Sequence, residues 1–238
     1  MLRRTWDSVA SECTDMLGPN GYGAVRVAPP AESLKQADYY WWDVYQPYSY
    51  ELSGRFGTAA EFASMVNACH DAGVKVYTDA VINHTAAQTS RSRRCIRARP
   101  RQRPTTTPPV TSWSDLESLP SSGVLTPDDS VSFVTNHDTE RNGLHMSYKD
   151  GDAYRLANVF QLAYKWSTPT VYSGFEFSSS DQAPPNSNGF VTDTDCSGGW
   201  YCLHRDTAVD EVVERDRLVR WQRDPHDPRE ERDRLLRR

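Results

Sequence analysis

The sequence lacks several features that would place it in a common class of proteins. It contains no run of about 18 apolar residues, so we expect no membrane-spanning helix and no membrane partner. Two arginines near the N-terminus, Arg3 and Arg4, are not followed by an apolar segment, so no signal peptide is visible. Hydrophobic residues make up only 37% of the 238 residues, which is typical of a soluble chain with few core-forming residues.

An excess of positive charge is also missing. The formal net charge is −5, which argues against a protein dedicated to nucleic acids. Residues 91–103 form a local basic run, but no aromatic residue stands between the arginines on which bases would stack. We therefore expect no nucleic-acid partner, and binding of this run to DNA or to another anionic surface is the least favoured alternative.

Two regions of the chain alternate strand and helix patterns. The first predicts strands at 22–28 and 74–82, joined by a helix that Thr58 caps and for which Glu61 completes a capping box. The second predicts strands and a helix, in the order 131–135, 153–166 and 170–177. Strands alternating with helices are typical of an α/β protein with a parallel sheet.

Two other segments carry neither pattern. Residues 88–112 are rich in arginine and proline, and residues 205–238 are rich in charges, with one charged helix predicted at 209–221. Such compositions bury too little apolar surface to offset the entropy of ordering. They are also what a gene rich in G and C gives when it is read out of frame. We therefore divide the chain into residues 1–87, 88–112, 113–204 and 205–238.

Polar side chains follow two of the predicted strands. Strand 131–135 runs directly into Asn136-His137-Asp138, and strand 74–82, which contains Asp79, runs into Asn83-His84. In a parallel β/α barrel the ends of the strands carry the chemistry. The alternatives are structural, because Asn-His-Asp also forms ordinary turns and a lone histidine at a strand end more often supports the fold.

An aromatic segment is the third candidate. Trp41, Trp42 and Tyr45 stand close together, with Gln46 beside them. Aromatic faces attract the apolar C–H face of a pyranose, so these side chains fit a surface on which a sugar stacks. They also fit a protein core, although two adjacent tryptophans in a polar loop bounded by prolines argue against full burial.

These three segments, in the order in which they follow one another along the chain (41–46, 79–84 and 136–138), resemble the α-amylase family of glycoside hydrolases (glycoside hydrolase family 13), and within it the actinobacterial and animal type. The resemblance covers roughly residues 6–84 and 115–204. It implies an α/β fold, an incomplete (β/α)8 TIM barrel with about four of its eight strands recognisable. It also implies action on α-1,4-glucans such as starch and maltooligosaccharides.

The resemblance gives the candidate residues individual roles. Asp138 matches the catalytic carboxylate that stabilises the transition state, and Asp79 matches a residue that braces the site by hydrogen bonds. The residues matched to substrate binding are Trp41, Trp42, Tyr45, Gln46, His84 and His137.

Two inorganic ions follow from the resemblance alone. Asn83 matches a calcium ligand, and Asn136 matches a position that binds chloride in chloride-dependent members. A calcium ion takes six to eight oxygens, so one amide oxygen does not make the site. The other ligands of the family lie in a part of its sequence that has no counterpart here.

Two catalytic carboxylates of the family are not found. Its nucleophile lies in a Gly-Phe-Arg-x-Asp pattern that does not occur in this chain. Neither Glu117 nor Glu176 stands where the general acid belongs, and the gap falls between His84 and Ser114. We therefore expect an internally deleted, inactive α-amylase-like hydrolase; the alternative is a non-catalytic remnant that binds carbohydrate.

The five cysteines allow two interpretations. The resemblance implies disulfides between Cys13 and Cys69 and between Cys196 and Cys202, which leaves Cys95 over. Such bridges imply secretion, as in the family, because disulfides persist in oxidising compartments. The alternative is that all five thiols are reduced.

Overall fold

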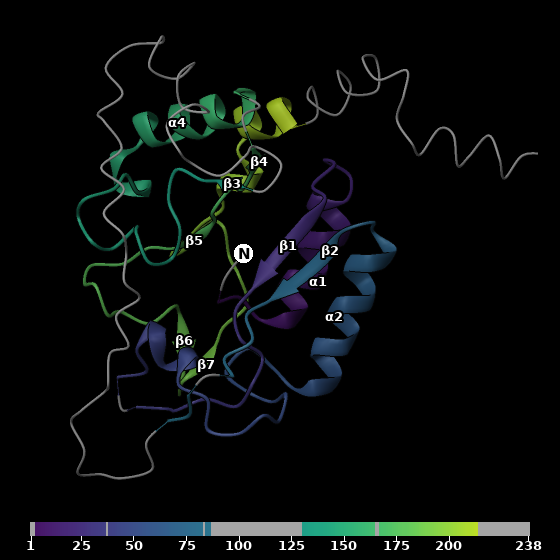
Figure 1. Cartoon of the computed structure of the whole chain (residues 1–238), viewed down its shortest axis with the longest axis vertical. Helices are drawn as coiled ribbons and strands as arrows, with labels where there is room; N and C mark the ends of the chain where they lie inside the picture. Colours follow the sequence, from purple (N-terminus) through teal and green to yellow (C-terminus); the bar gives the residue numbers. More distant parts are fainter. Residues whose placement is uncertain (1–2, 37, 83, 87–129, 165–166, 214–238) are drawn as a thin grey trace, which may run out of the picture.

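A computed structural model describes residues 3–36, 38–82, 84–86, 130–164 and 167–213 (Figure 1). The predictions for Asn83, Cys95, Glu117 and segment 88–112 lie outside the described residues. In the described part, no helix is both long and apolar enough to cross a bilayer.

The N-terminal half is a helical segment followed by a strand–helix–strand unit. Helix α1 (Trp6–Glu12) continues as a π-helical turn, η1 (Cys13–Leu17), and leads into strand β1 (Ala24–Val27). Helix α2 (Ala59–Asp71) then returns the chain to strand β2 (Lys75–Thr78). Strands β1 and β2 pair in parallel, with Val25 opposite Val76, and the two helices lie beside them (Figure 1).

Local sequence explains the ends of α2. The hydroxyl of Thr58 accepts a hydrogen bond from the Glu61 amide (3.3 Å), and the Glu61 carboxylate accepts one from the Thr58 amide (2.6 Å). This is the capping box that the sequence predicts. The helix ends before Gly73, whose φ of +77° is one that residues with a side chain rarely adopt.

The C-terminal half contains one helix and several very short strands. Strand β3 (Val131–Ser132) pairs in parallel with β4 (Thr168–Pro169), and helix α4 (Asp152–Ala163) lies between them in sequence. The Gln161 side chain joins this helix to β3 by donating to the Ser132 carbonyl (2.7 Å).

Two antiparallel pairs and several short helices complete the description. Strand β5 (Gly174–Phe175) pairs with β8 (Trp200–Tyr201), and β6 (Asn186–Ser187) pairs with β7 (Phe190–Val191). The short 3-10 helices are η2 (Trp41–Tyr45), η5 (Tyr148–Asp150) and η6 (Leu203–Arg205). Residues 207–213 form a last helical stretch, which lies near α4 (Figure 1).

Two predictions about the sheet are wrong. We expected the strands before His84 and before the 136–138 triplet to share one parallel sheet, but the described strands form four separate two-stranded sheets. Segment 170–177 was expected to be a barrel strand, yet only Gly174–Phe175 is a strand, and it pairs in antiparallel fashion with β8. The second prediction fails for a local reason. The loop closed by Cys196–Cys202 contains β8 and places it beside β5.

A shared core joins the two halves. Trp6 and Val9 of α1 and Met65 of α2 are buried in the same cluster as Phe175 and Trp200 of the C-terminal half. Residues 205–213, which composition placed in a charged tail, also reach this body, since Val209 has no exposed surface. The halves are therefore held together by apolar contacts between residues far apart in sequence.

Both predicted disulfides are confirmed. Cys13 and Cys69 are joined with a Cα–Cα distance of 4.9 Å, which ties η1 to α2. Cys196 and Cys202 are joined across 5.6 Å and close a short loop around β8. The alternative of five reduced thiols is wrong for these four residues.

The capping box predicts a measurable contribution to stability. Replacing Thr58 by Ala removes the cap from the first turn of α2 and should lower the free energy of unfolding by about 1 kcal/mol. Urea unfolding measures the change. Ser64→Ala, in the exposed middle of the same helix, is the matched control and should raise stability by ~0.5 kcal/mol. A Thr58→Ala variant as stable as the control would contradict the prediction.

Candidate functional site

A pocket of about 530 Å³ collects residues from four separate segments. These segments are β1, η2, the residues after β2 and the turn after β3. Its lining is Arg26, Trp41, Trp42, Tyr45, Asp79, Ala80, Asn136, His137 and Asp138. Although β2 and β3 are not in one sheet, the residues that follow them do meet. We call this cavity the aromatic pocket.

The two tryptophans of η2 form part of its wall. Both are half-buried, and Trp41 also packs against the core cluster. The Trp41 indole donates to the Ser180 carbonyl (2.8 Å), and the Trp42 indole donates to the Asp181 carboxylate (3.3 Å). Tyr40 stacks on Trp42 with ring centroids 5.1 Å apart. The indoles are therefore fixed in orientation by their N–H groups.

Tyr45 connects the two halves of the pocket. Its ring lies parallel to that of His137, with centroids 5.6 Å apart and an interplanar angle of 1°. Its hydroxyl donates to Asp79 (2.9 Å) and lies 3.2 Å from Nε2 of His137. A phenol has one proton to give. Because Asp79 receives that proton, Nε2 of His137 is the donor in the second contact.

Asp79 also binds a residue that the sequence analysis did not find. Nε and Nη2 of Arg26 donate to one oxygen of Asp79, at 2.9 and 2.7 Å. The other oxygen accepts from Tyr45, so both oxygens of this carboxylate are engaged. The sequence pattern could have indicated Arg26. In Val25-Arg26-Val27 a polar residue stands between two apolar ones, which places the arginine on the side of β1 opposite to the buried valines.

The Asn136-His137-Asp138 triplet does form a turn, and the turn positions its side chains. Oδ1 of Asn136 accepts hydrogen bonds from the amides of Asp138 (2.9 Å) and Thr139 (3.0 Å). His137 is buried, whereas 68% of the Asp138 side chain is exposed. The turn and the functional interpretation are therefore compatible, because the turn brings both residues to the pocket.

Two predicted binding residues do not line the pocket. Nε2 of His84 lies 2.8 Å from the Tyr45 carbonyl, which gives it a contact with the backbone of η2. Gln46 ends η2, and its carbonyl accepts from the Leu34 amide (2.9 Å). Both residues are neighbours of Tyr45, but neither is among the residues around the cavity.

A buried charged group lies behind the tryptophans. The Arg3 guanidinium is 4.1 Å from the Trp41 ring centroid and 3.8 Å from the Glu140 carboxylate. Glu140 accepts hydrogen bonds from Tyr172 (2.9 Å) and Tyr201 (2.7 Å). Composition gave no signal for this group, because an arginine in a sequence is expected at the surface.

The environment of His137 keeps its imidazole neutral. Burial first, and then the positive charges of Arg3 and Arg26, lower the pKa of His137 to about 3. Its Nδ1 is buried and has no hydrogen-bond partner within the described residues. The Tyr45 ring and the Nε2–H contact therefore hold a neutral ring whose second nitrogen is an acceptor.

The described residues do not assemble a metal centre from ionisable ligands. No group of three or more His, Cys, Asp or Glu side chains among them could hold a metal ion. Asn83 lies outside the described residues, and the oxygen of Asn136 is engaged in its own turn. Calcium and chloride therefore stay predictions from the resemblance.

Comparison with known proteins relates the chain to α-amylases. A family model described as α-amylase catalytic domain matches residues 15–107. An α-amylase of Streptomyces violaceus is 28% identical over 338 positions, which cover 90% of this chain, and one of Phaedon cochleariae is 48% identical over 82 residues, or 34% of it. The chain is therefore similar to α-amylases over most of its length. The family match extends to residue 107, so it includes most of segment 88–112, which composition had set apart.

Solved α-amylases share its fold. The structure resembles that of an α-amylase I variant from Eisenia fetida in complex with maltohexaose, with a TM-score of 0.73 and 17% identity. The match covers 89% of this chain and 75% of that one. The small parallel sheets of this α-amylase relative are thus parts of a (β/α)8 barrel, present in partial form.

The chain spans only part of the length of the curated relatives that it matches. It spans 58% of the Streptomyces violaceus enzyme, and 56% of the Thermomonospora curvata enzyme, which is also 28% identical; the Phaedon cochleariae match covers 17% of that protein. The first alignment has 338 positions and the chain has 238 residues. At least 100 positions (338 minus 238) of that relative are therefore without a counterpart here.

The state of His137 predicts a pH dependence. Its pKa is 6.5 when unperturbed and about 3 in the fold, so the unfolded chain binds more protons between these values. This contribution to stability is fully present above pH 6.5 and is lost as the pH falls toward 3. The free energy of unfolding should decrease less on acidification in His137→Gln than in His145→Gln, which removes an exposed histidine. Equal decreases in the two variants would contradict this.

Proposed function

We propose that this chain binds α-1,4-glucans, including maltooligosaccharides, in the aromatic pocket. The observation that carries the proposal is that Trp41, Trp42, Tyr45, His137 and Asp138 surround one cavity, although they come from both halves of the chain. A related α-amylase fold has been solved with maltohexaose, which supports the same class of ligand.

The chemistry of the wall suits a sugar. Indole rings that are held by their N–H groups offer faces against which the C–H groups of a glucose ring pack. The exposed carboxylate of Asp138 accepts hydrogen bonds from hydroxyl groups. The pocket therefore combines an apolar face with acceptors, as recognition of a pyranose requires.

We further propose that the chain does not hydrolyse the glucan that it binds. Retaining glycosidases need a nucleophilic carboxylate and a general acid about 5 Å apart. Asp79 is the other carboxylate of the pocket, but Arg26 and Tyr45 occupy its two oxygens. Glu176 does not line the pocket. Asp138 is then left with the supporting role that the resemblance gives it.

An internal deletion accounts for the missing groups. The unmatched positions in the alignment with the Streptomyces violaceus enzyme support the loss of a segment that would carry the nucleophile, the general acid and most calcium ligands. Neither calcium nor chloride has a role in this proposal. The two disulfides support an origin in an exported protein, because such bridges persist in oxidising compartments.

Binding is tested directly with maltohexaose. The purified full chain should bind it with a dissociation constant of about 1 mM, the weak affinity of a ligand that buries few groups. Trp42→Ala removes one stacking face and should abolish measurable binding by calorimetry. Tyr77→Ala, which removes an exposed aromatic outside the pocket, should bind like the parent chain. Undiminished binding by Trp42→Ala would place the sugar elsewhere.

Hydrolysis is tested separately with soluble starch. Loss of a general acid alone costs ~10²–10⁴ in rate, and loss of the nucleophile removes the covalent route. Reducing sugar should therefore not rise above the buffer level, with or without added calcium. If hydrolysis is measured and disappears in Asp138→Asn, the inactive assignment is wrong and another carboxylate, Glu117 first, acts as the acid.

A further inference from the structure

The two disulfides differ in their exposure to solvent. Cys13 and Cys69 have no exposed surface, so no thiol in solution can reach their sulfur atoms. Cys196 is exposed and Cys202 is half-buried. The Cys196–Cys202 bond is therefore the one that a dissolved thiol reaches while the protein is folded.

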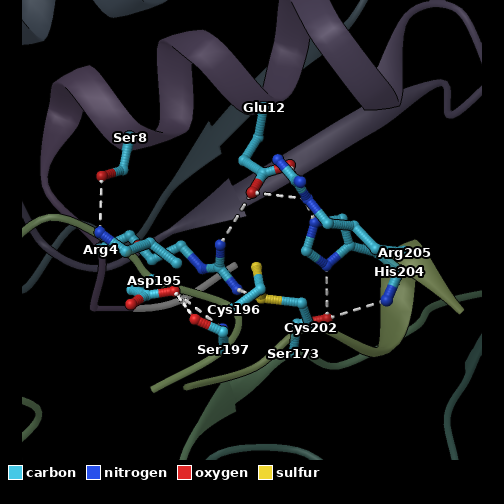
Figure 2. The surroundings of a disulfide bond; sticks show 11 residues. Arg4, Ser8, Glu12, Ser173, Asp195, Cys196, Ser197, Cys202, His204 and Arg205 are labelled. Carbon is cyan, nitrogen blue, oxygen red and sulfur yellow. Dashed lines mark hydrogen bonds and ion pairs between the residues drawn. A yellow bond between two sulfur atoms is a disulfide. The ribbon is translucent and has the colours of Figure 1, made fainter. Parts of the chain in front are cut away.

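A buried cation lies against one end of this accessible bond. Nη2 of Arg4 is 3.1 Å from Sγ of Cys202, and Nη1 of the same guanidinium is 3.1 Å from a Glu12 oxygen (Figure 2). The guanidinium also faces the Trp200 ring, 5.4 Å from its centroid. Burial lowers the pKa of Arg4 to about 10, so it stays charged at neutral pH.

The positive charge of Arg4 is only partly balanced by the groups around it. Glu12 is shared with two other side chains. Its second oxygen, Oε2, lies 3.0 Å from Nε of Arg205 and 3.1 Å from Nε2 of His204 (Figure 2). Burial lowers the pKa of His204 to about 4, so this ring is neutral at pH 7. Two guanidinium groups thus share one carboxylate beside the sulfur of Cys202.

The other end of the bond has the opposite charge near it. Asp195 precedes Cys196, and its carboxylate accepts hydrogen bonds from the hydroxyl (2.6 Å) and the amide (2.8 Å) of Ser197. These hydrogen bonds lower the pKa of Asp195, which keeps it ionised. A thiolate is favoured next to a cation and disfavoured next to a carboxylate. The two sulfur atoms are therefore unequal as leaving groups.

We propose that Cys196 is a modification site for small thiols such as glutathione, with Cys202 as the leaving group. The thiolate of the small thiol attacks Sγ of Cys196 and forms a new S–S bond to it. The Cys196–Cys202 bond breaks, and its electron pair stays on Cys202 as a thiolate paired with Arg4. No other oxidant or reductant is needed, because the step is an exchange. This proposal does not depend on the sugar-binding proposal.

The fold tolerates this modification. Trp200–Tyr201 of β8 pairs with β5, and His204 of η6 binds both Ser173 (2.8 Å) and Glu12 (3.1 Å). These contacts lie on both sides of Cys202 and do not use its disulfide. The thiolate of Cys202 moreover keeps the contact with Arg4, so the modified chain stays folded.

The experiment maps where the small thiol attaches. The full chain carrying Cys95→Ser is treated briefly with reduced glutathione, quenched with acid, and its free thiols are blocked with N-ethylmaleimide. Chymotrypsin cleaves after Trp200 and Tyr201 and so separates the two cysteines for mass spectrometry. Glutathione should be found on Cys196 about ten times more often than on Cys202, with Cys13–Cys69 intact. Equal or reversed labelling, or earlier opening of Cys13–Cys69, would overturn the proposal.

Two matched variants test the part played by Arg4. Arg4→Met should slow the cleavage about ten-fold and make the labelling of the two cysteines nearly equal. Arg205→Met removes the other guanidinium bound to Glu12 but has no contact with the sulfur, and it should keep the labelling on Cys196. Circular dichroism checks that both variants fold. If Arg4→Met does not fold, the proposal is judged by the ratio of glutathione on Cys196 to that on Cys202 in the chain that keeps Arg4. Unchanged rate and ratio in folded Arg4→Met would refute the role of the guanidinium.

Discussion

The carboxylate of Glu12 binds groups from both ends of the described chain. Arg4 precedes its helix, whereas His204 and Arg205 belong to the last described segment. Burial alone would raise the pKa of Glu12, but the hydrogen bond from His204 and the bonds and charges of Arg205 and Arg4 lower it to about 2. A buried carboxylate that lost these partners would cost several kcal/mol. Residues 204–205 therefore help to hold α1 in place, in addition to its apolar contacts.

The aromatic pocket also depends on contacts between the N-terminal and C-terminal halves of the chain. Asp79 and Tyr45 belong to the N-terminal half, and His137 reaches them from the other half. Further contacts of this kind support the wall, since Arg55 donates to the Gly189 carbonyl (2.9 Å) and Trp41 donates to the Ser180 carbonyl (2.8 Å). In a complete barrel, hydrogen-bonded strands place the ends of strands together. Here β2 and β3 are not paired with each other, and side-chain contacts bring the residues that follow them together.

Features with a local cause were predictable from the sequence. The capping box of Thr58 and Glu61 is set by residues three apart, and the Asn136 turn by neighbouring amides. The disulfide pairs came from family resemblance, since spacing alone does not determine pairing. Strands were predicted at 131–135 and 170–177, but the two-residue lengths of β3 and β5 were not, because the apolar pattern does not show how many residues pair. The buried Arg3 and Glu140 were missed because their burial depends on partners that only the tertiary structure supplies.

The charges of the pocket favour one class of ligand over others. Arg26 is paired with Asp79, so its positive charge is balanced at the wall. His137 is neutral because burial and the nearby arginines lower its pKa to about 3. The exposed carboxylate of Asp138 then gives the surface of the cavity a negative balance. A phosphate-bearing ligand would be repelled there, whereas the hydroxyl groups of a neutral sugar can donate to Asp138 while its C–H face packs on Trp41 and Trp42. The charges of the pocket are thus compatible with the sugar ligand that we propose.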